Sequence, residues 1–140
     1  MQRVLVLCTG NSARSQMAEG WLRAEAGDRF EVFSAGSQPT GAVHPGAVQA
    51  MKEIGVDISW HSSKSMQQFI GQPFDYVLTV CDNAAEACPI FPGKATRFHH
   101  DFPDPAKAPV EKQMDAFRSV RDAQIMWLRD VLALDAKASA

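Results

Sequence analysis

The sequence predicts an α/β fold in which a parallel sheet of four strands lies between helical layers, as one three-layer αβα domain over residues 1–140. Short aliphatic runs alternate with longer helix-forming segments, which is the pattern of a parallel sheet covered on both faces. The length of 140 residues suits one domain, and 46% hydrophobic with 21% charged residues is ordinary globular composition. These observations exclude intrinsic disorder and a small disulfide-stapled scaffold.

The first predicted unit is a strand, a tight loop and a helix. Arg3–Leu7 is an aliphatic run suited to a strand buried on both faces, and it ends at Cys8. Helix-forming sequence then runs from Ser15 to Ala26, with apolar residues spaced by three and four. A second strand, Glu31–Ala35, is closed by Gly36.

The same periodicities predict the rest of the fold. The further elements are a helix from Pro45 to before Gly55, a short helix after Ser63, strands Tyr76–Val80 and Ala95–His99, and a long helix from Glu111 to about Lys137. Cys81 directly follows its strand, as Cys8 follows the first. Ligands of parallel sheets bind beyond the carboxyl ends of the strands. We therefore expect the two cysteines to lie close together despite 73 residues of separation.

Charge and hydropathy exclude several classes of partner. Fourteen basic and sixteen acidic residues give a net charge of −2, unlike a nucleic-acid-binding domain. The longest strongly apolar run, Val4–Cys8, is too short to span a membrane and lacks the pattern of a signal peptide. We expect a cytoplasmic protein without membrane or nucleic-acid partners. In a reducing compartment its three cysteines indicate catalytic or metal chemistry.

The loop after the first strand has the pattern of an anion site. Cys8 and Arg14 are separated by five residues, and a hydroxyl residue follows. This spacing is weak by itself, but here it joins a buried strand to a helix. Successive N–H groups can then surround a tetrahedral anion at the positive end of that helix. The predicted oxyanion-binding residues are Thr9, Gly10, Asn11, Ser12, Ala13, Arg14 and Ser15.

Each polar residue of this loop has an expected task. Arg14 can bind two oxygens of the anion, placing it over Cys8. The surrounding N–H groups favour the thiolate form of a cysteine, and Ser15 can donate a hydrogen bond to the sulfur. Gly10 and Asn11 suit a loop with left-handed backbone. The alternative is a purely structural role, with a buried and unreactive Cys8 and a solvated Arg14 in the first helical turn.

Cys81 and Cys88 lie seven residues apart in a segment that favours helix. Seven helical residues separate Cα atoms by about 10.5 Å. This exceeds the limit of roughly 7 Å for a disulfide. A bond between them therefore requires the segment to unwind. A zinc site with His99 and His100 competes with this interpretation, although the spacing is longer than zinc sites usually have. Two unreactive, packed thiols are the third possibility.

An acid is expected at the same edge of the sheet. Asp104 precedes Pro105 in the loop after the last predicted strand, and a protonated Asp104 could donate to an oxygen that leaves the anion. Asp101 is a local rival for this role. An aspartate before proline is also a common turn former.

Cys8–Trp21 resembles the active-site loop of the low-molecular-weight protein tyrosine phosphatase superfamily, and more narrowly that of thioredoxin-coupled arsenate reductases. The similarity continues in order along most of the chain. Further matching segments are Ser34–Gly36, Ala50–Glu53, Asp57–Ser59, Cys81–Ile90 and Asp104–Pro105.

The resemblance implies a reductase that detoxifies arsenic with phosphatase machinery and needs no cofactor. Cys8 would attack arsenate held by Arg14 while Asp104 protonates the departing oxygen. Cys81 would attack the Cys8 adduct and release arsenite. Cys88 would then attack Cys81, leaving a Cys81–Cys88 disulfide for thioredoxin to reduce.

One departure concerns a cation. Some relatives hold potassium near the loop with Asn, Glu, Ser and Asp side chains, and the first three correspond here to Asn11, Glu19 and Ser34. Lys64 stands at the fourth position. We expect its ammonium group to take the place of the cation and pair with Glu19, so that potassium hardly stimulates the protein and no metal is bound.

Two other functions stay open at this point. A phosphatase acting on phosphotyrosine or small phosphate esters needs only Cys8, Arg14 and Asp104, although Ala106 and Lys107 stand where phosphatases commonly have aromatic residues. A non-catalytic oxyanion-binding or redox-sensing module is the second. For a reductase, thioredoxin is favoured over glutaredoxin as the reductant, and a monomer is expected.

Overall fold

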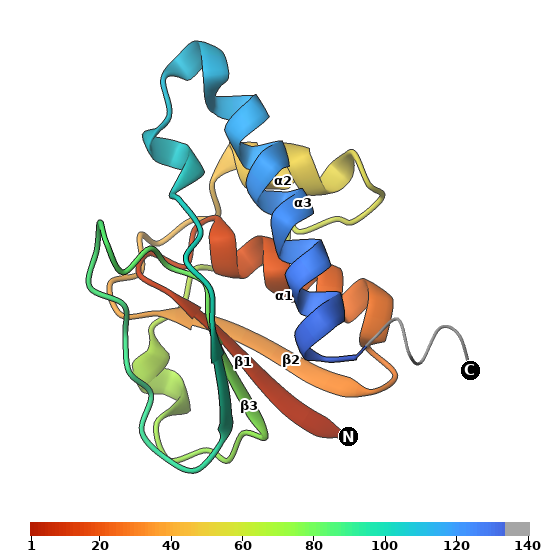
Figure 1. The fold of residues 1–140 in the computed structure, drawn as a ribbon, viewed down its shortest axis with the longest axis vertical. Helices are drawn as coiled ribbons and strands as arrows, with labels where there is room; N and C mark the ends of the chain where they lie inside the picture. The colour runs from red at the N-terminus through yellow and green to blue at the C-terminus, as the bar shows by residue number, and fades with distance from the viewer. Residues whose placement is uncertain (134–140) are drawn as a thin grey trace.

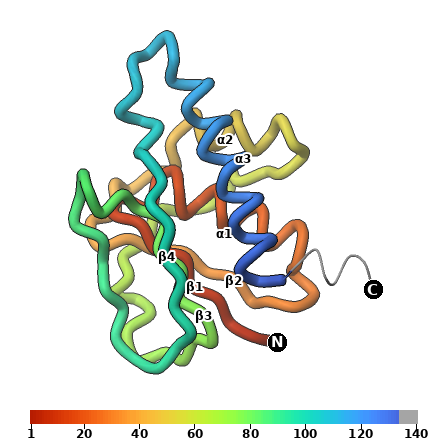
Figure 2. Tube along the Cα trace, viewed as in Figure 1, coloured from red at the N-terminus to blue at the C-terminus, as the bar shows by residue number. Residues whose placement is uncertain are grey.

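In the computed structural model, which describes residues 1–133, four parallel strands form one sheet in the order β2-β1-β3-β4 (Figures 1 and 2). The strands are β1 (Gln2–Cys8), β2 (Phe30–Gly36), β3 (Tyr76–Thr79) and β4 (Thr96–His99). The predicted α/β class and four-stranded parallel sheet are confirmed. In the register Cys8 pairs with Gly36 and Leu7 with Thr79. The carboxyl ends of these strands therefore meet at one edge.

The three α-helices all cover the same face of the sheet, as Figure 1 shows. They are α1 (Arg14–Ala26), α2 (Pro45–Lys52) and α3 (Gln113–Val131). The opposite face carries the 3-10 turn η1 (Met66–Phe69) and neighbouring loops. Two more 3-10 turns, η2 (Pro105–Lys107) and η3 (Val110–Lys112), lead into α3. The two outer layers are thus unequal, which hydrophobic periodicity could not predict.

The central strand β1 builds a core on each face. Val4 and Val6 belong to the cluster beneath the α-helices, whereas Leu5 and Leu7 belong to the cluster on the other side. This is the alternation of a strand buried on both faces, as its aliphatic sequence predicts. Burial of Val4–Leu7 fixes the position of Cys8 at the end of the strand.

Helix boundaries differ from prediction at three places. The segment after Cys81 is not helical, and α1 begins one residue earlier than expected, at Arg14. The last helix begins after the turn η3 and ends at Val131, where the backbone leaves the helix and Ala133 adopts φ 54°. The remainder of the predicted helix toward Lys137 lies outside the described residues.

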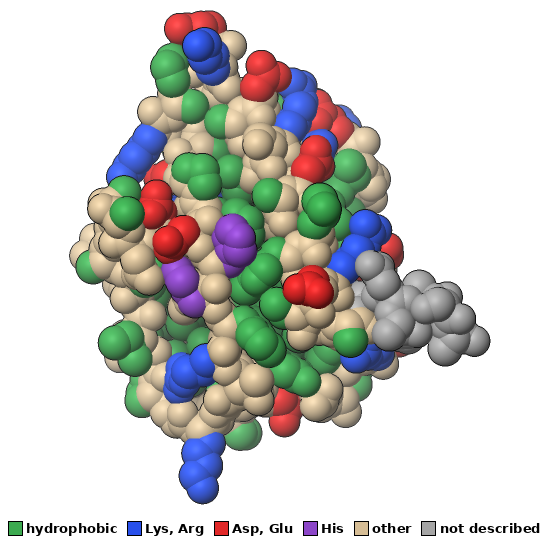
Figure 3. Space-filling model, in the orientation of Figure 1, with side chains coloured by type: hydrophobic (Ala, Val, Ile, Leu, Met, Phe, Trp, Pro, Cys, Tyr) green, Lys and Arg blue, Asp and Glu red, His purple; other side chains and the backbone are tan. Residues whose placement is uncertain are grey.

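Surface charges are mixed on the face seen in Figure 3, where acidic and basic side chains are interspersed. Such a surface has no broad basic stripe on this side, in agreement with the small net charge. Among the described helices, none is both long and apolar enough to cross a bilayer.

Candidate active site

A cavity of about 260 Å³ lies at the carboxyl end of β1. Its walls come from four parts of the chain: the loop after β1, the loop after β2, the cysteine segment and the turn η2. The lining residues are Cys8, Thr9, Gly10, Ser12, Ala13, Arg14, Gln38, Thr40, Glu86, Asp104 and Lys107. The expected gathering of the loop, the cysteine segment and Asp104 at one sheet edge is therefore present.

The loop is shaped by the hydrogen bonds of its carbonyl groups. Three of them accept from the segment after β2: Thr9 O from Gln38 N at 2.9 Å, Gly10 O from Thr40 N at 3.0 Å, and Ser12 O from His44 N at 2.8 Å. The fourth, Asn11 O, accepts from the Gln16 side-chain amide at 3.1 Å. In a trans peptide the following N–H points away from that carbonyl. With the carbonyls held by the scaffold, successive N–H groups turn to the opposite side, where they can surround an anion.

Asn11 is the internal support of the loop. Its φ of 48° is left-handed, a conformation that asparagine tolerates better than most residues. The side-chain amide donates to Ser15 Oγ at 2.7 Å and to Ser34 Oγ at 3.0 Å, and its oxygen accepts from Lys64 N at 2.8 Å. Gly10, in contrast, does not adopt the left-handed conformation that we expected. A Cβ there would instead press on Thr40, at 3.1 Å from its methyl carbon.

Gly36 lets β2 approach the loop closely. A Cβ at this position would clash with Thr9 O and lie 3.0 Å from Asn11 N. The Gly36 position pairs directly with Cys8 in the sheet. The end of the second strand therefore needs a residue without a side chain. From the sequence, Gly36 was expected only to end this strand.

Cys8 is a buried free thiol, only 2% exposed. Its sulfur is hydrogen-bonded to Ser15 Oγ at 2.9 Å and accepts from Asn11 N at 3.2 Å. No side chain caps the first turn of α1, whose N-cap is Ala13, so the positive end of that helix is open toward the loop. A backbone N–H and the open end of α1 therefore both lie next to the sulfur.

Arg14 is engaged by a residue that sequence reasoning did not assign to the site. Its two terminal nitrogens each donate to one carboxylate oxygen of Glu86 at 2.8 Å, and one also donates to Phe102 O at 3.0 Å. Burial opposes the charge of Arg14, but Glu86, with Cys8 and Asp104 nearby, raises the pKa of the guanidinium above its usual range. Arg14 reaches the cavity as expected, with a carboxylate bound to it.

Asp104, rather than Asp101, lies at the cavity. Its Oδ2 is 3.9 Å from an Arg14 nitrogen, and its Oδ1 accepts from Ala106 N at 3.0 Å, capping η2. Asp101 is instead exposed and accepts from Asn83 N and His99. Asp104 thus forms the expected turn with one oxygen and places the other near Arg14, while its role as an acid stays a prediction.

Cys81 and Cys88 form a disulfide with a Cα–Cα distance of 5.8 Å. The segment between them is unwound, as the geometry of helices requires for such a bond. His99 offers a nitrogen within 4.8 Å of both sulfurs, so part of the zinc alternative is present in space. His100, however, stacks on Phe102. In the disulfide the two sulfurs offer no thiolate, the form in which cysteine binds zinc.

Lys64 was expected to take the place of a bound cation and to pair with Glu19. Its ammonium group is 3.9 Å from Glu19 Oε1 and donates to Ser62 O at 2.8 Å. Glu19 also accepts from Ser34 Oγ and from Arg23. Burial lowers the pKa of Lys64, Glu19 raises it, Arg23 lowers it, and the net shift is downward. The predicted Lys64–Glu19 contact is thus present at the outer edge of an ion-pair distance.

Three cavity residues were missed in the sequence, namely Gln38, Thr40 and Glu86, whereas Lys107 was noted only as standing where phosphatases commonly have an aromatic residue. Gln38 and Thr40 follow the second strand, and their place beyond its carboxyl end could have identified them as candidates for the site. Glu86 lies between two cysteines that were themselves assigned to the site. Its contact with Arg14 depends on the unwound path of the segment, which no local pattern specifies.

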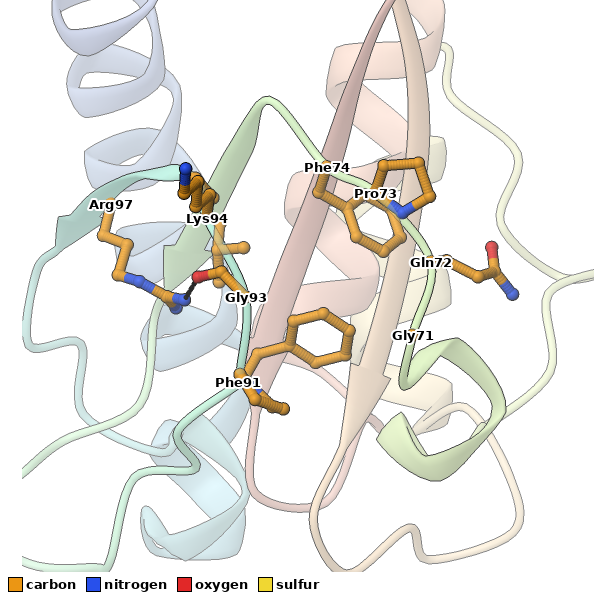
Figure 4. Close-up of a pocket in the computed structure, with 11 residues that line it drawn as sticks. Gly71, Gln72, Pro73, Phe74, Phe91, Gly93, Lys94 and Arg97 are labelled. Atoms are coloured by element: carbon orange, nitrogen blue, oxygen red, sulfur yellow. Dashed lines mark hydrogen bonds between the residues drawn. The ribbon is translucent and has the colours of Figure 1, made fainter.

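A second cavity of about 270 Å³ lies on the sheet face opposite the α-helices, between residues 71–74 and 91–97 (Figure 4). Phe74 and Phe91 form much of its wall, with ring centroids 5.6 Å apart. Arg97 donates to Gly93 O at 2.6 Å. None of the described residues lining it is a cysteine, histidine or acid. Cys8 and Asp104, the predicted nucleophile and acid, line the first cavity instead.

Comparisons with known proteins cover both the loop and the cysteine segment. A family model described as low molecular weight phosphotyrosine protein phosphatase matches residues 3–133. The arsenate reductase of Halalkalibacterium halodurans is 50% identical over 121 residues, which are 85% of this chain and 86% of the relative. A solved structure of an arsenate reductase in the oxidized state aligns with a TM-score of 0.75 at 27% identity, covering 95% of this chain and 98% of the other. A thioredoxin-dependent arsenate reductase of Corynebacterium glutamicum aligns with a TM-score of 0.66 at 27% identity, covering 95% of this chain and 63% of that one.

Proposed function

Because this chain belongs to the low molecular weight phosphotyrosine protein phosphatase family, we propose that it applies the anion site of that family to the reduction of arsenate to arsenite. The observation that carries the proposal is the Cys81–Cys88 disulfide at the edge of the sheet that holds Cys8. A phosphatase needs one nucleophilic cysteine. A reductase also needs two electrons for each turnover, and a neighbouring dithiol supplies them.

The first step is an attack on arsenic. The Cys8 thiolate, hydrogen-bonded by Ser15 and Asn11 N, attacks arsenate held by the loop N–H groups and by Arg14. A sulfur–arsenic bond forms and one oxygen leaves. Asp104, in the cavity wall, gives that oxygen a proton so that it departs as water. Arg14 offsets the negative charge that gathers on the remaining oxygens.

The relay then moves oxidation from arsenic to the cysteines. Cys81 attacks the sulfur of Cys8, a disulfide forms, and the electron pair of the broken sulfur–arsenic bond stays on arsenic, which leaves as arsenite. Cys88 attacks Cys81, and Cys8 departs as a thiolate. Two cysteines have then lost two electrons in total. A free Cys8 beside a Cys81–Cys88 disulfide is the end state of this sequence and the state of the described structure.

The disulfide must be reduced before another turnover. We infer that thioredoxin performs this step, because an internal dithiol completes the cycle without a glutathione adduct and the Corynebacterium glutamicum relative is thioredoxin-dependent. Cys88 is half-buried and Cys81 fully buried, so a partner's thiolate reaches Cys88 first. Such recycling fits a protein of the cytoplasm acting as a monomer.

The test follows NADPH oxidation in the presence of thioredoxin and thioredoxin reductase, with and without arsenate. Wild type is expected to consume NADPH only when arsenate is added, and Cys81→Ser and Cys88→Ser are each expected to abolish turnover. Hydrolysis of an aryl phosphate serves as the control, since it needs only Cys8, Arg14 and Asp104. Phosphate-ester hydrolysis without any arsenate-dependent turnover would make the protein a phosphatase and overturn the proposal.

A further inference from the structure

The carboxylate of Glu86 lies where an oxyanion would be bound. Its two oxygens accept from both terminal nitrogens of Arg14 at 2.8 Å, and one also accepts from the Thr9 hydroxyl at 2.6 Å. Both side chains are largely hidden from solvent, Arg14 at 5% and Glu86 at 11% exposure. We propose that Glu86 is an internal oxyanion mimic that closes the arsenate site while the Cys81–Cys88 disulfide is present and leaves it when that disulfide is reduced.

The contact has the geometry by which arginine recognises a tetrahedral oxyanion. A guanidinium presents two parallel N–H donors, and two oxygens of a carboxylate, phosphate or arsenate fit this pair equally well. Burial raises the pKa of Glu86, but the hydrogen bonds from Arg14 and Thr9 outweigh it and hold the pKa below its usual range. Glu86 is therefore an anion at neutral pH, as its partner requires.

This arrangement excludes a second anion for two reasons. The end-on donor pair of Arg14, one N–H from each terminal nitrogen, already donates to Glu86, and a further N–H donates to Phe102 O, so this pair is not available to a second anion. In addition, an arriving arsenate or phosphate dianion would meet the negative charge of a poorly solvated carboxylate, and like charges repel strongly where water is scarce. Oxyanion binding thus requires that Glu86 first move away.

The position of Glu86 depends on the disulfide. The bond holds the Cα atoms of Cys81 and Cys88 5.8 Å apart, and the intervening chain forms a turn in which Ala85 N and Glu86 N both donate to Asp82 O. Residues 84, 85 and 87 are alanine, the residue with the highest helix propensity. A helix over this segment would separate the two cysteines by about 10.5 Å. Helix formation therefore displaces Glu86, two residues before Cys88.

Reduction of the Cys81–Cys88 disulfide is the step that releases Glu86, and it is a thiol–disulfide exchange in which electrons and protons balance. A dithiol gives two electrons and two protons, its own sulfurs become a disulfide, and the Cys81–Cys88 bond is replaced by two thiols. The inference rests on the proposed function, because it takes the cavity at Arg14 to be the arsenate site. Its consequence is an ordered cycle in which the spent enzyme cannot hold a new oxyanion until its reductant has acted.

The experiment measures phosphate binding by calorimetry, with phosphate chosen because the relay cannot reduce it. Wild type and Glu86→Gln are each studied with the disulfide intact and after reduction by a dithiol, and a thiol titration verifies one free cysteine or three. If Glu86 occupies the site in most molecules, only the remaining open molecules can bind phosphate. The apparent affinity for phosphate is then the intrinsic affinity multiplied by the fraction of open molecules. We expect reduction to tighten phosphate binding by about tenfold or more in wild type and by less than about twofold in Glu86→Gln.

Asp82→Asn is the matched control, since it removes a carboxylate from the same segment without touching Arg14. It is expected to keep the wild-type dependence on reduction. Equal phosphate affinity of oxidised and reduced wild type, or an unchanged redox dependence in Glu86→Gln, would overturn the internal mimic and leave the proposed function standing. Phosphate binding to neither protein in either state would overturn the oxyanion site, and with it both proposals.

Discussion

At the scale of single residues, the site is organised by side chains that hold other side chains. Asn11 is fully buried and joins the hydroxyls of Ser15 and Ser34 to the backbone of Lys64. Ser15 in turn contacts the sulfur of Cys8. A buried network of this kind is stable only when every member has its partner. Cys8 is therefore held in place by a chain of buried polar side chains that reaches back to Ser34 and the backbone of Lys64.

Lys64 leads to a prediction about potassium. Its ammonium group lies 3.9 Å from Glu19, where relatives of the arsenate reductase type were expected to hold a cation. Because that positive charge is already built in, exchanging sodium for potassium at constant ionic strength should change the KM for arsenate by less than about twofold. Lys64→Asp should create a clear dependence on potassium. Lys112→Asp, a distant and exposed change, is the control. A large potassium-dependent fall in the KM of wild type would refute the replacement.

At the scale of elements, the strands and helices were largely predictable from their periodicity, whereas two features were not. Periodicity shows that a helix has an apolar face but not which side of the sheet receives it, so the one-sided placement of α1, α2 and α3 stayed hidden. The segment after Cys81 has strong local helix propensity, and a covalent bond overrides it. For the same reason the sequence revealed Cys8, Arg14 and Asp104 but not Glu86.

The end of α2 is joined to α3 by an ion cluster that gives a prediction about pH. Glu53, directly after α2, accepts from Arg118 and Arg121 of α3. Hydrogen bonds from Arg118 are the main cause that lowers the pKa of Glu53 from 4.5 to about 2. A carboxyl whose pKa is lowered in the folded state contributes stability above its unfolded pKa and loses it as the pH falls toward the folded value.

Glu53→Gln should therefore have a lower urea midpoint than wild type at pH 7, and the difference should shrink between pH 4.5 and about 2. Unfolding curves at several pH values measure this directly. Glu111→Gln, in the exposed turn η3, is the control and should follow wild type throughout. A difference that persists unchanged at pH 2 would show that the charge of Glu53 is not its cause.

At the scale of the whole molecule, one strand couples two cores of different size. The cluster beneath the α-helices contains Leu128, and the smaller cluster on the other face contains Phe74. Both rest on β1, whose successive residues point into one and then the other. Two cores that share a central strand cannot separate without breaking the sheet. We therefore expect the molecule to unfold in one cooperative transition.

Core substitutions test this coupling. Leu128→Ala should lower the free energy of unfolding by roughly 2–5 kcal/mol and Phe74→Ala by roughly 3–5 kcal/mol, because each leaves a cavity. Exposed Met126→Ala should change it by less than about 0.5 kcal/mol. Trp21 and Trp127 both pack on the helix side and Trp60 is exposed, so the change in tryptophan fluorescence as buried tryptophans become solvated reports that core. If Phe74→Ala shifted the circular-dichroism midpoint but not the fluorescence midpoint, the two cores would be independent.

The hydrogen bonds that hold the carbonyl groups of the loop after β1 also determine whether this loop can keep its shape outside this fold. Its partners are Gln38, Thr40, His44 and Gln16, and three of these lie beyond the second strand. An excised peptide with the eight letters from Cys8 to Ser15 would keep the nucleophile and the arginine, but its peptide groups would turn toward water. Grafting this chemistry onto another scaffold therefore means carrying over the surrounding acceptors and donors as well, with a glycine at the neighbouring strand end.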